Sequence, residues 1–97
     1  MSKIYVNQPF RLELNVNQNI EGASAIIKVK RKNGPSTEQF DLNATIIDAE
    51  IGVIQSLVTP TINNIVGKWT VWAYITFANG DMIPGEPYSF EIYKEGC

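Results

Sequence analysis

The most informative absence in this chain is histidine, which none of its 97 residues supplies. Histidine is the usual general base, the commonest metal ligand and the side chain that titrates near neutral pH. Ser-His-Asp and Cys-His nucleophile systems are therefore excluded. No other set of side chains indicates catalysis, so we expect a protein that is not an enzyme, with no cofactor and no metal site.

Cysteine is nearly absent as well. The single cysteine, Cys97, is the last residue of the sequence, so no disulfide can form within the chain. Stability must then come from apolar burial and strand pairing. An unreactive tail is the simplest interpretation of Cys97, and pairing with another chain is left open.

Long apolar runs and an excess of positive charge are also missing. No segment approaches the roughly 20 apolar residues that cross a membrane, and residues 1–5 lack the apolar run of a signal peptide. The formal net charge of −2 gives no attraction to phosphate backbones or anionic lipid. We therefore expect synthesis in the cytosol and no membrane or nucleic acid among the partners.

The chain does contain period-two alternation, most clearly over residues 66–80. One face of this predicted strand carries Trp69, Val71, Ala73, Ile75 and Phe77, and the other carries Thr70, Trp72, Tyr74 and Thr76. Asn79-Gly80 then predicts a two-residue type I′ turn. The chain returns through residues 88–93, with Tyr88, Phe90 and Ile92 on the inward face, and the prolines and glycine of residues 84–87 predict a kinked entry to that strand.

Further β segments precede this hairpin. Residues 10–16 and 25–30 alternate, residues 39–47 hold one strand or two, and residues 53–58 form a short strand that Pro60 ends. Residues 61–66 form a polar connection with room for one helical turn. Six to eight short strands with turn signals between them predict a single all-β domain over residues 1–97, either a β-sandwich or a small barrel, with its core at 4–93 and a tail at 94–97.

The segment Ile65–Val71 has the residue spacing of strand F in immunoglobulin-like sandwiches. Gly67 takes the glycine position, Trp69 the aromatic position and Val71 the cysteine position. The partner cysteine of strand B is missing, and Ile27 or Val29 stands nearby. The spacing thus favours an immunoglobulin-like antiparallel β-sandwich without a disulfide.

A wider resemblance covers residues 10–93. The chain resembles the amino-terminal immunoglobulin-like domain of tailed-phage baseplate upper proteins and related small virion proteins, through residues 22–25, 28–34, 44–52, 67–69 and 76–80. This resemblance implies a non-enzymatic structural or accessory protein of a phage virion, on the tail, baseplate or capsid surface. Its partners would be other virion proteins, with the chain forming a homo-oligomer or binding to a symmetric lattice.

Charged candidates have simple structural interpretations. Asp48 and Glu50 are typical of a turn, and Asp81 with Glu86 supplies too few oxygen atoms for a calcium site. The only basic cluster, formed by residues 28 and 30–32, lacks the interleaved aromatics of a nucleic-acid surface. We expect its lysines to protect an edge strand from pairing with other chains.

Three aromatics are not explained by the core, because Trp72, Tyr74 and Tyr93 fall on the outward face of the last hairpin. Such side chains are enriched at protein contacts, and we interpret them as the partner-binding residues. An alternative is that a loop or the 61–66 connection covers them within the monomer. The second functional interpretation is a carbohydrate-binding adhesion module, in which the same aromatics would stack on host glycans.

Overall fold

The predicted alternation produces an all-β protein. Within residues 3–94 and 96, which the computed structural model describes, there are nine strands and no helix, and so no helix that could span a membrane. The strands are β1 (Ile4–Tyr5), β2 (Phe10–Asn15), β3 (Ser24–Asn33), β4 (Ser36–Asn43), β5 (Thr45–Asp48), β6 (Val53–Val58), β7 (Gly67–Thr76), β8 (Met82–Pro84) and β9 (Tyr88–Tyr93).

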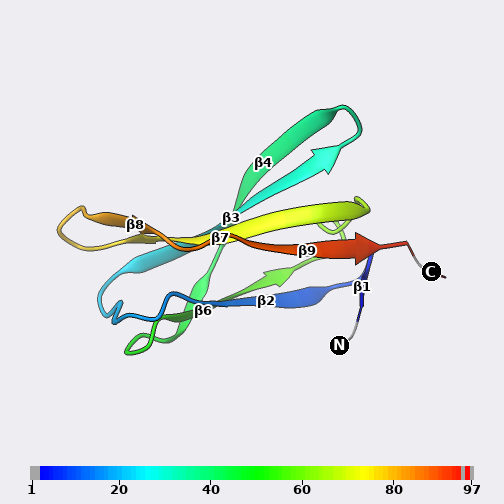
Figure 1. Ribbon diagram of the computed structural model, residues 1–97. Helices are drawn as coiled ribbons and strands as arrows, with labels where there is room; N and C mark the ends of the chain where they lie inside the picture. Colours follow the sequence, from blue (N-terminus) through cyan, green and yellow to red (C-terminus); the bar gives the residue numbers. More distant parts are fainter. Residues whose placement is uncertain (1–2, 95, 97) are drawn as a thin grey trace.

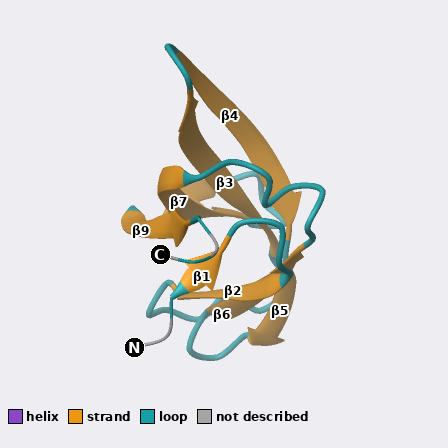
Figure 2. Cartoon of the chain, turned by 90° about the vertical axis from the view of Figure 1, so that its right-hand side faces the viewer, coloured by secondary structure: helices purple, strands orange, loops and turns teal. Residues whose placement is uncertain are grey.

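Two sheets face each other (Figures 1 and 2). The larger has the order β1-β9-β7-β3-β4, with β8 also paired to β7, and the smaller has the order β2-β6-β5. Every pair is antiparallel except β1 with β9. This is the immunoglobulin-like arrangement, with β7 in the place of strand F, so the predicted sandwich without a disulfide is confirmed.

The core lies between the sheets and is centred on Trp69. Its side chain is fully buried, and its ring centroid lies 6.0 Å from that of Phe10, 6.3 Å from Phe40 and 5.9 Å from Phe90. From Trp69 to Thr76 the buried and half-buried residues of β7 alternate without interruption. The face predicted to point inward is the buried one, as expected when an apolar row packs between two sheets.

The hairpin that follows β7 differs from the predicted type I′ turn. Phe77 donates its N–H to Asp81 O at 2.8 Å and accepts from Gly80 N at 2.9 Å, so three residues connect the pair. Gly80 has φ of 93°, and Asn79 is not among the residues with positive φ. This is a type I turn closed by a glycine in the left-handed region, which needs only one positive φ where type I′ needs two.

The returning strand is divided, and together with the short strand β1 this brings the count to nine where six to eight were expected. Tyr74 pairs with Pro84, whereas Val71 pairs with Tyr88, so residues 85–87 contain one residue more than the β7 segment they oppose. Two prolines stand at this point, and neither can donate to the ladder. The predicted kinked entry is therefore confirmed, as a bulge that separates β8 from β9.

Strand β3 occupies a different place from the one expected. Ile27 and Val29 were placed near strand B, but β3 pairs directly with β7 in the same sheet, Val29 lying opposite Val71. Across the core, β7 contacts β2, where the Phe10 ring packs against the Trp69 ring. Because β3 is flanked by β7 and β4, its lysines do not protect an edge, and that interpretation is wrong.

Residues 39–47 belong to two strands, β4 and β5, which lie in different sheets. Ala44 alone separates them, so the chain passes directly from one sheet to the other on this side of the sandwich. The β3–β4 hairpin projects beyond the rest of the molecule at its other end (Figures 1 and 2). Cys97 lies outside the described residues.

Candidate protein-contact surface

The outer face of the larger sheet carries the aromatics that the core does not use. Trp72 and Tyr74 point away from the smaller sheet and are half-buried, while Trp69, Val71, Ala73 and Ile75 between and beside them are buried. Trp72 lies opposite Lys28 and Tyr74 opposite Ile26 on β3. The two aromatics therefore form a row along β7 with an aliphatic neighbour beside it.

Strand β8 extends this apolar area. Pro84 lies opposite Tyr74 and Met82 opposite Thr76, and the Tyr74 hydroxyl donates to Met82 Sδ at 3.1 Å. Met82 is 58% exposed. We call these five residues the outer patch: Ile26, Trp72, Tyr74, Met82 and Pro84.

Polar groups border the outer patch on the β3–β4 side. Lys28 Nζ lies 4.9 Å from the centroid of the Tyr74 ring and 3.6 Å from Asp41 Oδ1. On the β9 side, Thr70 and Ser89 share a hydrogen bond of 3.0 Å between their hydroxyls. An apolar centre with a polar border is the usual composition of a protein interface.

Tyr93 does not belong to this surface. Gly67 pairs with Ile92, so Tyr93 lies beside residue 66, six residues along β7 from Trp72. At about 3.3 Å per residue, that separation is about 20 Å. Tyr93 pairs instead with Tyr5 and lies under Lys3 Nζ, which is 4.9 Å from its ring centroid. The structure thus brings together two of the three predicted contact residues.

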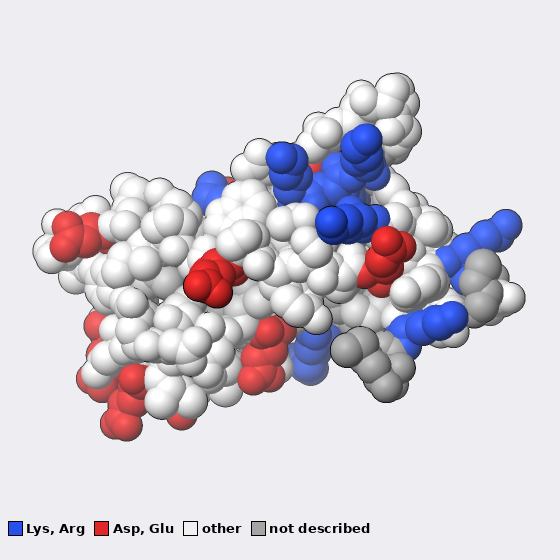
Figure 3. Space-filling view, viewed as in Figure 1, with Lys and Arg blue, Asp and Glu red and all other residues white. Residues whose placement is uncertain are grey.

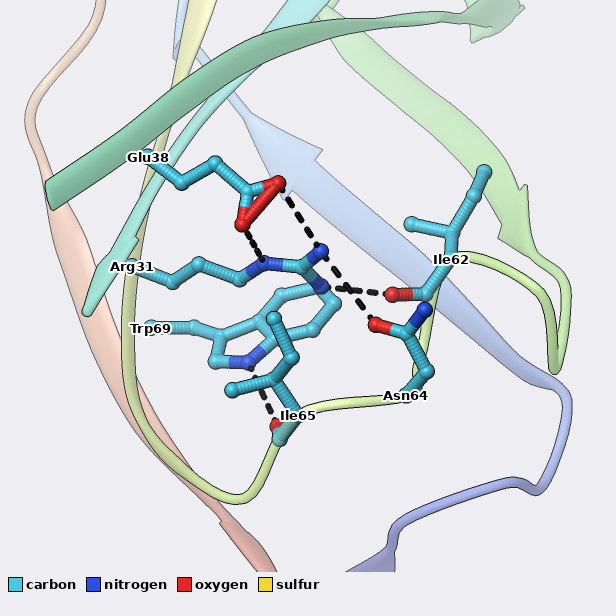
Figure 4. A network of polar contacts seen from close by, with 6 residues as sticks. All are labelled: Arg31, Glu38, Ile62, Asn64, Ile65 and Trp69. Carbon is cyan, nitrogen blue, oxygen red and sulfur yellow. Dashed lines mark hydrogen bonds and ion pairs between the residues drawn. The ribbon is translucent and has the colours of Figure 1, made fainter. Parts of the chain in front are cut away.

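One alternative was that the connection at residues 61–66 covers Trp72 and Tyr74. Hydrogen bonds of this connection instead involve Arg31 and Trp69. Arg31 Nη1 donates to Ile62 O at 2.5 Å, Arg31 Nη2 donates to Asn64 Oδ1 at 3.4 Å, and Trp69 Nε1 donates to Ile65 O at 3.4 Å (Figure 4). Both donors lie on the inner side of the larger sheet. These contacts therefore hold the connection against the inner side of the larger sheet and not against its outer face.

Arg31 itself departs from the prediction, which placed it in a basic surface cluster. It is only 6% exposed, and its guanidinium forms an ion pair with Glu38, Nη2 lying 3.3 Å from Oε2. The guanidinium carbon lies 4.8 Å from the Phe40 ring centroid and 5.0 Å from that of Trp69. In the period-two alternation Arg31 falls on the opposite face from its neighbours Lys30 and Lys32, and this was the signal that it faces inward.

Asn63 is a second buried polar residue that sequence reasoning missed. Its Nδ2 donates to Tyr5 O and to Gln8 O, both at 2.8 Å, and its backbone O accepts from Asn7 N at 2.7 Å. The Oδ1 atom has no hydrogen-bond partner. These bonds fix the segment between β1 and β2, which has a positive φ of 66° at Asn7.

The acidic candidates lie in turns or, as Asp48 does, at the end of a strand beside one. Asp48 Oδ1 accepts from Glu50 N at 3.2 Å, and Asp81 N donates to Asn79 Oδ1 at 3.0 Å. These are the local bonds that short polar side chains make in turns. Among the described residues, no group of three or more metal-ligating side chains of the Asp, Glu and Cys type comes together.

Charge is distributed unevenly along the molecule, which extends 45 Å in its longest dimension. Acidic groups gather toward the left of the view in Figure 3, where the turns after β2, β5 and β7 lie. Basic groups gather above the centre and toward the right, where both chain ends lie. The lysines Lys28 and Lys30 belong to the outer face of β3, next to the outer patch.

Comparison with known proteins supports the fold and no narrower conclusion. No protein-family model matches the chain, and no curated protein matches it at a significant level. Among solved structures, a proposed glycoside hydrolase from Bacteroides vulgatus is similar over 99% of this chain, with a TM-score of 0.55 and 12% identity. The chain spans 17% of the length of that protein.

Proposed function

We propose that this chain is a non-enzymatic structural domain that acts through protein contacts, and that its contact surface is the outer patch. The observation that carries the proposal is the pair formed by Trp72 and Tyr74 on the solvent side of β7, beside an exposed methionine. A buried Trp or Tyr at an interface contributes about 2 kcal/mol or more, so these rings suffice to anchor a partner.

The context we propose is a phage virion, with the chain attached to other structural proteins on the tail, baseplate or capsid surface. The support is the resemblance of residues 10–93 to the amino-terminal domain of baseplate upper proteins, together with the immunoglobulin-like strand order. A sandwich of this kind needs no cofactor to supply a rigid sheet for a symmetric lattice. Its role would be limited to burying the outer patch against a neighbouring protein.

The test is incorporation into particles. The double variant Trp72→Ala/Tyr74→Ala is expected to lose most of its copies per particle, measured by quantitative mass spectrometry of purified virions. Tyr93→Ala is the matched control, because it removes an aromatic from the same sheet at a point about 20 Å from Trp72. Unchanged incorporation of the double variant, with its circular dichroism spectrum preserved, would contradict the contact surface.

Copy number separates the possible locations. Hundreds of wild-type copies in each particle would indicate capsid decoration, whereas a few or a few dozen would indicate the tail or baseplate. Absence of the chain from purified particles would refute the virion context.

A carbohydrate-binding module is the second candidate, because Lys28, Asp41 and Thr70 place polar groups beside Trp72 and Tyr74. Aromatic faces bordered by hydrogen-bonding groups are what sugar recognition requires. Selective binding on a glycan array, lost in Trp72→Ala, would favour this function over subunit contact. Uniform absence of binding would exclude it for the glycans tested.

A further inference from the structure

The two sides of the sandwich are closed to different extents. On one side the chain passes from β4 to β5 through Ala44. On the other side β2 ends the smaller sheet, and in the described part of the chain it pairs with β6 alone. Two hollows, of about 660 and 620 Å³, lie between β2 and the β8–β9 segment, and Tyr88 lines both.

The ladder between β2 and β6 determines which backbone N–H and C=O groups of β2 point toward its free edge. Val16 N donates to Gly52 O at 2.9 Å, so these two residues form a hydrogen-bonded pair of the β2–β6 ladder. Such pairs alternate along antiparallel strands. Phe10, Leu12 and Leu14 therefore direct their N–H and C=O groups toward β6, and Arg11, Glu13 and Asn15 direct theirs toward the free edge.

Apolar side chains next to this edge are incompletely covered. Tyr88 belongs to the inward-facing row of β9 and is nevertheless 52% exposed. Phe10 and Leu14 also face inward and are half-buried, whereas Leu12 between them is buried. The inner row of β2 thus lacks a neighbour on the side where a further strand would lie.

The free edge is complementary to itself. If two copies of β2 pair antiparallel about a twofold axis through Leu12, Arg11 of each copy lies opposite Glu13 of the other. Both residues direct their backbone groups outward, so this pair can exchange two hydrogen bonds. The inner row then places Phe10 opposite Leu14 and Leu12 opposite its own copy, as cross-strand apolar pairs.

Other registers that preserve the hydrogen-bonding order are worse. A twofold axis at Arg11 places Arg11 opposite itself, and an axis at Glu13 places two carboxylates opposite each other. An axis at Leu14 places Glu13 opposite Asn15, without an opposite charge. Pro9 has no N–H and ends the ladder on one side, and Asn17, with φ of 56°, ends it on the other.

We propose that β2 is a dimerisation edge, and that its partner is β2 of a second copy of this chain in the register that pairs Arg11 with Glu13. The two smaller sheets then become one continuous sheet of six strands. Such a twofold interface is self-complementary, as in most homodimers. It uses a surface separate from the outer patch, which remains available on each copy.

Charge-reversal variants at Arg11 and Glu13 test the register directly. Arg11→Glu places two carboxylates opposite each other at both ends of the pairing, and Glu13→Arg does the same with two guanidinium groups. Each single variant is expected to weaken dimerisation about tenfold or more, measured by sedimentation equilibrium across a wide concentration range. The double variant Arg11→Glu/Glu13→Arg is expected to restore it, because the opposite charges face each other again.

A mixture of the two single variants provides the decisive measurement. Arg11→Glu carries two acidic residues on its edge and Glu13→Arg carries two basic ones, so the mixture is expected to form heterodimers where neither variant dimerises alone. Lys30→Glu is the control, since it makes the same charge change at an exposed residue of the other sheet and should leave dimerisation unchanged. Native mass spectrometry distinguishes the three dimers when one variant is isotope-labelled.

Several results would overturn the proposal. A wild-type chain that stays monomeric at millimolar concentration has no such edge contact. Single variants that dimerise like the wild type, or a mixture without heterodimers, would show that the Arg11–Glu13 register is wrong. Unchanged amide exchange at Arg11 and Glu13 between dilute and concentrated samples would likewise refute strand pairing, whatever the outcome for the outer patch.

Discussion

Gly52 is a position at which a single added methyl group is expected to destabilise the protein strongly. It has φ of 83° and is buried in the turn that precedes β6. A Cβ at this position would lie 2.5 Å from Val16 Cγ2 and 2.6 Å from Gln18 O. The second atom belongs to the backbone, so the clash cannot be relieved by rotating a side chain.

The cost of Gly52→Ala can be estimated from three contributions. The left-handed backbone conformation costs alanine about 1–2 kcal/mol, and displacement of the segment at residues 16–18 adds about 1–2 kcal/mol as overpacking. Weakening the hydrogen bond between Val16 N and Gly52 O costs about 1 kcal/mol. The lower entropy of the unfolded alanine chain offsets about 0.5–1 kcal/mol, which leaves a destabilisation of about 3 kcal/mol.

The matched control is Gly22→Ala. Gly22 has a similar φ of 75°, but a Cβ there would have no heavy atom within 4 Å. Only the conformational contribution remains, and the expected destabilisation is about 1 kcal/mol or less after the same offset. The difference between the two variants therefore isolates the contact with Val16 and Gln18.

Thermal unfolding monitored by circular dichroism measures both variants. For a domain of this size, each kcal/mol lowers the Tm by about 4–8 °C, so Gly52→Ala should lower it by about 15 °C and Gly22→Ala by a third of that or less. Equal shifts in the two variants would refute the reasoning, because the close approach of residues 16–18 would then contribute nothing.

Other predictions concern buried side chains. Trp69→Ala should cost about 3–5 kcal/mol and Trp72→Ala about 1 kcal/mol in urea titrations, since only the first ring is fully buried. Arg31→Met should cost about 1–3 kcal/mol, because Ile62 O in the 61–66 connection loses its donor and Glu38 loses one ionic partner, and Lys32→Met should stay within about 0.5 kcal/mol. Asn63→Ala should cost about 2–3 kcal/mol and accelerate amide exchange at residues 5–8. Equal effects of the two tryptophan variants, equal effects of the Arg31 and Lys32 variants, or unchanged exchange at residues 5–8 would each contradict these expectations.

The alternation of side chains was readable from the sequence because it is a local property. Consecutive residues of a strand face opposite sides of the sheet, so the inward row from Trp69 to Ile75 and the outward positions of Trp72 and Tyr74 follow from residue spacing alone. The same locality made the strand after Gly34-Pro35 and the strand after Gly52 foreseeable, since both turns carry their own conformational signals.

Strand neighbours were decided by the whole chain. The sequence does not state that β3 joins the sheet of β7, or that β4 and β5 separate into different sheets, because each pairing depends on how all the apolar rows are buried together. That choice buries Arg31 beside Trp69 and Glu38 although its neighbours in sequence are exposed lysines. It also leaves β2 with a free edge.

For the candidate surfaces, residue spacing determined the face and tertiary structure determined the place. Trp72, Tyr74 and Tyr93 share an outward face, but the register of β9 against β7 puts Tyr93 at the far end of the sheet from Trp72. Ile26 joins the outer patch through a pairing with Tyr74, a residue distant in the chain, whereas Met82 joins it through the local β7–β8 hairpin. The physical reason is that the direction of a side chain is set by its own backbone, whereas its neighbours are set by hydrogen bonds to other strands.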